Sequence, residues 1–148
     1  MATDSSNDYL KNLVPKSLDD IFRKNRDKGR LALATNEELD KLESKIAYMP
    51  IRHKITHWQI FMIHITEESG VQISSPRLIG KVEETGQSWI TSHVTKIDTS
   101  NGLIETTNSC YQVIGSRVDE ADLDLLHICV TLNQWGIGSS FGVPEFFY

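Results

Sequence analysis

Hydrophobic positions along this chain follow two patterns, with helical spacing near both ends and strand-like runs between them. Residues 35–50 predict a helix, because leucine and isoleucine recur at helical spacing after a capping box formed by Thr35 and Glu38. A shorter apolar stripe in residues 17–29, with Gly29 as its stop, predicts another helix upstream. The pattern therefore predicts two N-terminal helices.

The middle of the chain predicts a mostly antiparallel sheet of about four strands. Residues 57–65 are rich in β-branched and aromatic residues, and their centre is apolar on both faces, which favours a strand covered on both sides. Residues 77–115 predict a three-stranded meander, because loop signals at 84–87 and 99–102 interrupt the apolar runs. Its strands are expected at 78–83, 88–98 and 103–114.

The clearest helical pattern covers residues 119–135. Acidic residues crowd its N-terminal end, where the helix dipole favours them, and a broad apolar arc predicts packing against the sheet. The fold class is therefore α+β, with two N-terminal helices, a four-stranded meander and a C-terminal helix packed on the sheet. Residues 1–16 are expected to form a mobile lead-in, and 17–148 a single domain.

Composition places the chain among soluble, ordinary globular proteins, since 39% of its residues are hydrophobic and 24% are charged. Residues 1–16 are polar, with no apolar core of a signal peptide, and no run approaches the length of a membrane helix. We therefore expect a cytoplasmic protein that does not enter a membrane. Its two cysteines, Cys110 and Cys129, are expected to be reduced and structural, with Cys110 the more exposed thiol.

No motif predicts a metal site, a cofactor or a catalytic centre. The five histidines lack metal-ligand spacing, and the glycine-rich stretch 136–142 follows a helix instead of opening one, unlike a phosphate loop. An enzyme would need a site assembled from scattered residues on the sheet. That alternative is kept open, with candidate residues His57, His93, Thr91, Ser92 and Glu105.

Charge is distributed unevenly around a net value of −5. Residues 1–54 hold eleven Lys and Arg against nine acids, whereas 55–148 hold four against eleven. The basic stretch 23–30 is interleaved with acid, so we expect a solvated helix end and not a dedicated nucleic-acid binder. The acidic part favours a protein partner with a basic surface, because such complementarity accelerates association and selects partners.

The resulting hypothesis is a small acidic binding protein that occludes a partner protein, in the manner of a stoichiometric inhibitor, an immunity factor or a phage or mobile-element accessory protein. Its predicted contacts combine the acidic segment with the aromatic chain end, because aromatic side chains dominate interface hot spots. They are Asp119, Glu120, Asp122, Asp124, Phe146, Phe147 and Tyr148. A homo-oligomeric structural component, for example a homodimer, is a further alternative.

Overall fold

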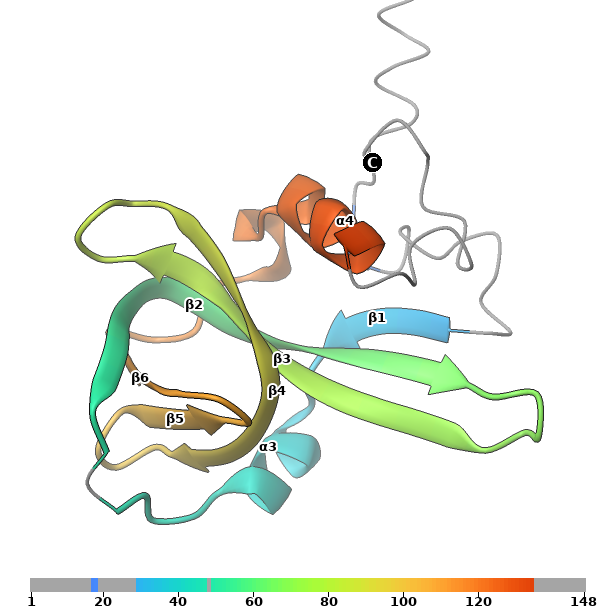
Figure 1. The fold of residues 1–148 in the computed structure, drawn as a ribbon, viewed down its shortest axis with the longest axis horizontal. Helices are drawn as coiled ribbons and strands as arrows, with labels where there is room; N and C mark the ends of the chain where they lie inside the picture. Colours follow the sequence, from blue (N-terminus) through green and yellow to red (C-terminus); the bar gives the residue numbers. More distant parts are fainter. Residues whose placement is uncertain (1–16, 19–28, 48, 135–148) are drawn as a thin grey trace, which may run out of the picture.

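The computed structural model describes residues 17, 18, 29–47 and 49–134 (Figure 1). Within these residues the fold is a sheet-rich α+β arrangement of six strands, two α-helices and one short 3-10 helix. In chain order the elements are β1 Gly29–Leu33, α3 Asn36–Leu42, β2 Ile51–Thr66, β3 Gln72–Val82, β4 Ser88–Asp98, β5 Leu103–Thr106, β6 Cys110–Val113, η1 Glu120–Asp122 and α4 Leu125–Gln134.

Strands β2 to β6 close into a barrel. Each strand pairs antiparallel with the next, and β6 then pairs in parallel with the first half of β2, from Ile51 opposite Cys110 to Ile55 opposite Val113. Strand β1 lies outside this ring and pairs antiparallel with the second half of β2. The predicted four-stranded meander is therefore a six-stranded sheet, most of it rolled into a barrel that Figure 1 shows end-on.

The middle of the paired strands β2 and β3 is buried on both faces, as the sequence predicts for the centre of residues 57–65. One face fills the barrel interior, where Ile60, Met62 and Leu78 are buried. The other face packs beneath α4 (Figure 1). That second core contains Phe61, Ile63 and Ile79 from the strands and Ile128, Cys129 and Leu132 from α4. The prediction that the C-terminal helix packs on the sheet is confirmed.

The N-terminal part differs from the prediction of two helices. Residues 19–28 of the first predicted helix lie outside the described residues, and Gly29 begins strand β1. The Thr35 and Glu38 capping box is present at the start of α3, but the helix ends at Leu42 and does not continue toward residue 50. It ends because Glu43 adopts an extended conformation and forms a bridge with Ile97 of the barrel. Tertiary contact here outweighs local propensity.

Two later elements are interrupted where continuous ones are predicted. The last meander strand, expected at 103–114, is split into β5 and β6 by a tight turn in which Thr106 and Ser109 exchange hydrogen bonds. The helix expected from residue 119 begins with η1 and continues as α4 only from Leu125. Neither α3 nor α4 is long and apolar enough to cross a membrane, nor is any other helix among the described residues.

A β-bulge in β2 divides this long strand into a first half that pairs with β6 and a second half that pairs with β1. Thr56 lies opposite Lys81 and Gln59 opposite Ile79, so His57 and Trp58 together face the single residue Gly80. His57 has a φ of 49°, a left-handed conformation uncommon for residues other than glycine. Such bulges bend a strand and redirect its side chains. The bend separates the half of β2 that closes the barrel from the half that pairs with β1.

Candidate functional site

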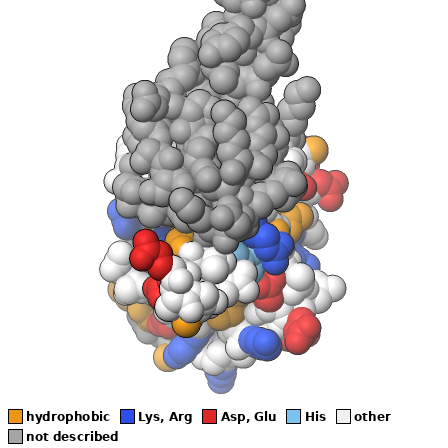
Figure 2. Space-filling model, turned by 90° about the vertical axis from the view of Figure 1, so that its right-hand side faces the viewer, with side chains coloured by type: hydrophobic (Ala, Val, Ile, Leu, Met, Phe, Trp, Pro, Cys, Tyr) orange, Lys and Arg blue, Asp and Glu red, His pale blue; other side chains and the backbone are white. Residues whose placement is uncertain are grey.

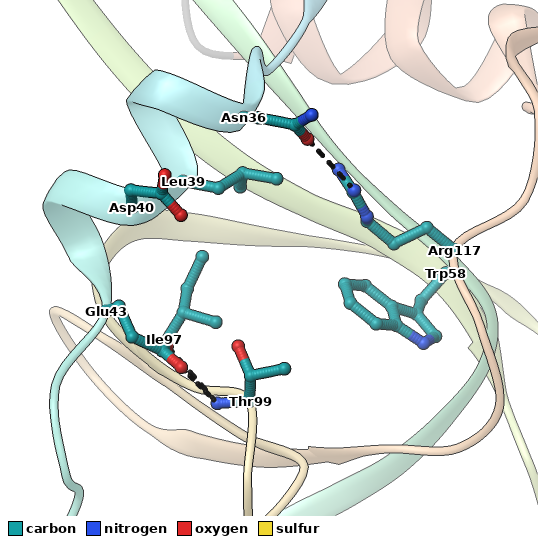
Figure 3. Close-up of a pocket in the computed structure, with 8 residues that line it drawn as sticks. All are labelled: Asn36, Leu39, Asp40, Glu43, Trp58, Ile97, Thr99 and Arg117. Atoms are coloured by element: carbon teal, nitrogen blue, oxygen red, sulfur yellow. Dashed lines mark hydrogen bonds between the residues drawn. The ribbon is translucent and has the colours of Figure 1, made fainter.

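The described structure has a hollow at one end of the barrel, which we call the mouth pocket. It lies between α3, the turn that joins β4 to β5, and the segment 114–118. The part under α3 has a volume of about 220 Å³, and the part under the turn about 310 Å³. Both parts are lined by Trp58, Ile97, Thr99 and Arg117. Figure 3 shows these side chains with Leu39, Asp40 and Glu43 of the α3 side.

The bulge in β2 and the segment 115–118 together fix Trp58 in the wall of the pocket. The indole Nε1 donates a hydrogen bond of 2.9 Å to the carbonyl oxygen of Gly115. The backbone N–H of Val118 donates to the Trp58 carbonyl, and the amide of Gln59 donates to the Val118 carbonyl at 2.7 Å. With its N–H group satisfied, the indole offers an apolar ring face to a ligand.

The rim of the mouth pocket carries opposite charges on its two sides. On the α3 side Asp40 is exposed, and the Glu43 carboxylate accepts the backbone N–H of Thr99 at 3.1 and 3.2 Å (Figure 3). On the other side the Arg117 guanidinium donates to Asn36 Oδ1 at 3.5 Å. The rim therefore combines an apolar wall with charged groups on preformed elements, which is typical of ligand pockets.

Asp98 stabilises the floor of the pocket. Its carboxylate accepts the side-chain amide of Asn101 at 2.9 Å and the backbone N–H of Ile46 at 3.0 Å. The Asn101 side chain first, and then the Ile46 N–H, hold the pKa of this carboxyl below its usual value of 3.8. Asp98 thus remains charged and joins the chain after α3 to the turn between β4 and β5.

Two of the four predicted acidic contacts already hold the backbone. Glu120 accepts the N–H of Leu18 at 2.8 Å, and Asp124 caps α4 by accepting the N–H of His127 at 3.0 Å. Asp119 and Asp122 are exposed. On the face in Figure 2, acidic and basic side chains alternate over the described part of the surface. The predicted aromatic contacts, Phe146, Phe147 and Tyr148, lie outside the described residues.

Among the residues considered for an enzyme, His57, His93 and Glu105 have separate local partners. His57 hydrogen-bonds to Thr56, and His93 Nδ1 lies 2.8 Å from Ser75 Oγ. Glu105 pairs with Lys96, and the buried Thr91 hydroxyl donates to the backbone carbonyl of Ser92. Desolvation, and then the charge of Arg77, lower the pKa of His93. Among the described residues, no hydrogen bond links these histidines to Glu105 or to Thr91.

Both cysteines are free and buried, as expected for structural thiols. Cys110, expected to be the more exposed thiol, is buried as well, since only 1% of the residue is exposed at the start of β6, where it pairs with β2. Burial raises the pKa of Cys110, and raises that of Cys129 to about 11. Within the described ranges, no group of three or more His, Cys, Asp or Glu side chains is placed to hold a metal ion.

Comparison with protein-family models, with curated proteins and with solved structures found no match for this chain. The residues of the mouth pocket come from β2, α3, the end of β4, β5, the end of β6 and the segments that follow α3, β4 and β6. Sequence reasoning missed them because no local motif joins such distant positions. The two signals available were the tryptophan within the predicted strand 57–65 and the arginine that follows Gly115.

Proposed function

We propose that this protein acts by binding a partner protein and that the mouth pocket is its recognition site. The observation that carries the proposal is the fixed indole of Trp58 beside Leu39 and Ile97, under a charged rim (Figure 3). Because the indole N–H and the Glu43 carboxylate are already hydrogen-bonded, the pocket is organised before a ligand arrives. Such preorganisation lowers the entropic cost of binding.

The charge of helix α3 favours a partner segment that carries positive charge. Four acids stand against one lysine between residues 36 and 43, on the helix that forms one side of the pocket. They are Glu37, Glu38, Asp40 and Glu43. A positively charged side chain that enters between this rim and Trp58 gains both carboxylate attraction and contact with an aromatic face.

This proposal keeps the acidic binding protein with a basic partner but moves the central contact from residues 119–124 to the pocket. Glu120 and Asp124 each already accept a backbone N–H through one carboxylate oxygen, so part of their hydrogen-bonding capacity is used within the fold. Asp119 and Asp122 remain candidates for a more peripheral contact. Occlusion of the partner's own site is the mode of action that we propose for the bound state.

Two matched charge reversals test the site. Glu37 and Asp40 are both exposed on α3, but only Asp40 lines the mouth pocket. In affinity capture from the native host, Asp40→Lys is expected to lose a partner that the unchanged chain retains, whereas Glu37→Lys is expected to keep it. Equal retention by both variants would contradict the proposed site.

A further inference from the structure

One stretch of β3 has an edge that no other described strand pairs with. β3 pairs with β2 along its whole length, from Gln72 to Val82, but its pairing with β4 begins only at Arg77. Figure 1 shows this part of β2 and β3 projecting beyond the barrel as a hairpin. Among the described strands, residues 72–76 of β3 therefore have a partner on one side only, and such edges are templates for further pairing.

Within this stretch, Gln72 and Ser74 direct their backbone groups outward, as the later part of β3 shows. There the N–H of Leu78 donates to the Thr91 hydroxyl on β4, and the N–H of Val82, on the same side of the strand, donates to the Gln87 carbonyl. Because the direction of these groups alternates along a strand, Gln72 and Ser74 also direct their N–H and C=O to that side. No hydrogen bond within the described structure reaches those outward groups.

The same stretch exposes apolar side chains. Val71 is 56% exposed and Ile73 is 47% exposed, and they are two of the five large hydrophobic residues exposed in the described structure. Ile73 lies opposite Ile65, which packs against the core under α4. The apolar surface of that core thus continues outward along the edge strand, where it meets water.

We propose that this edge pairs with the same edge of a second copy of the chain, antiparallel and about a twofold axis at Ile73. In this register Gln72 of each copy faces Ser74 of the other, and both pairs exchange N–H and C=O. Ile73 then faces its own copy as a non-hydrogen-bonded pair, in which Cα atoms lie about 4.5 Å apart. An isologous contact of this kind closes after two subunits.

The limits and charges of the edge fit a second copy. Pro76 has no N–H and β4 occupies the edge from Arg77, so the ladder ends there, while the turn at 67–70 ends it on the other side. The proposed pairing of Gln72 with Ser74 fits between these two limits. It also brings the acidic turn, with Glu67 and Glu68, toward Arg77 of the other copy. Because the ladder is short, the dimer is expected to be weak and reversible.

Two cysteine variants test the register. Under mild oxidation Ile73→Cys is expected to form a disulfide-linked dimer, because residue 73 lies on the axis and its two copies fall within disulfide reach. Val71→Cys is the matched control, because Val71 is at least as exposed as Ile73 but lies off the axis. Its two copies are about 13 Å apart along the strands, so its crosslinking is expected to be roughly tenfold slower or absent.

Sedimentation of the full chain gives an independent readout. The unchanged protein is expected to show a concentration-dependent shift from monomer to dimer that Ile73→Lys abolishes, while the urea midpoint of Ile73→Lys stays that of the unchanged chain. Three results would overturn the proposal: a monomer up to millimolar concentration, a dimer that Ile73→Lys does not weaken, or equal crosslinking of both cysteine variants. If the edge instead binds an extended segment of another protein, the purified chain stays monomeric, which is the first of these three results.

Discussion

Gly80 approaches Thr56 so closely that a Cβ atom on Gly80 would lie 2.8 Å from the Thr56 carbonyl oxygen, and it would also meet Ile55 Cγ2. The absence of a side chain therefore allows the bulge of His57 and Trp58 to approach β3. Because that bulge presents Trp58 to the mouth pocket, the site depends on a glycine in the neighbouring strand.

Replacing Gly80 by alanine is expected to destabilise the fold by about 1–3 kcal/mol, since the added methyl group must displace backbone as well as the Ile55 side chain. The free energy of unfolding, measured by urea denaturation, checks this. The neighbouring exposed change Lys81→Ala is the control and is expected to stay within about 0.5 kcal/mol of the unchanged chain. An equal effect of both changes would show that the close approach at Gly80 does not affect the free energy of unfolding.

The parts of the fold that sequence predicted are those specified by local chemistry. The capping box of Thr35 and Glu38 marked the start of α3, and the loop signals at 84–87 and 99–102 marked the turns on either side of β4. The uninterrupted apolar run around Ile60 indicated a strand buried on both faces. Each of these signals lies within a few residues of the structure it specifies.

The features that sequence missed depend on distant contacts. Closure of the barrel requires β6 to pair in parallel with β2, across more than fifty residues, and β6 is only four residues long. Gly29 is a good helix stop in isolation, yet β1 forms because Leu31 is buried between β2 and α4. The mouth pocket also depends on contacts between residues far apart in sequence, so no single stretch of sequence predicts it.

The cap of α4 gives a second prediction. Asp124→Ala is expected to reduce stability by about 1 kcal/mol, because the N–H of His127 loses its acceptor at the start of the helix. Asp122→Ala, two residues earlier and exposed, is expected to change the unfolding free energy by less than about 0.5 kcal/mol. Thermal or urea unfolding separates the two. If Asp122→Ala lowers the unfolding free energy as much as Asp124→Ala does, helix capping does not explain the effect of Asp124.

The lowered pKa values of two histidines predict that the free energy of unfolding falls on mild acidification. Desolvation is the main cause that lowers the pKa of His64 and His93 below the ordinary 6.5. The unfolded chain therefore binds protons more readily, so their contribution to stability is complete above pH 6.5 and is lost as the pH falls toward the folded pKa values. Urea midpoints measured through this range are expected to decrease.

The double variant His64→Gln with His93→Gln is expected to flatten that pH dependence. Glutamine keeps a polar group near Ser74 and Ser75, the hydrogen-bond partners of the two rings, but does not titrate. An unaltered slope in the double variant would assign the effect to other groups.

The two thiols are expected to be unreactive in the folded protein. Cys110 is 1% exposed and Cys129 is 0% exposed, and burial raises both pKa values, so little thiolate is present at about pH 8. Titration with an aromatic disulfide reagent should modify both cysteines in denaturant and neither in buffer. Rapid modification of one thiol in the native chain would show that its burial is transient.

The central claim is that the partner is bound at the mouth pocket. Hydrogen exchange of the captured complex against the free chain tests it most directly, because it reports each backbone segment separately. The account predicts slower exchange in residues 36–43, 97–103 and 114–117, which surround Trp58. Slower exchange confined to residues 119–124, with the segments around the pocket unchanged, would contradict it.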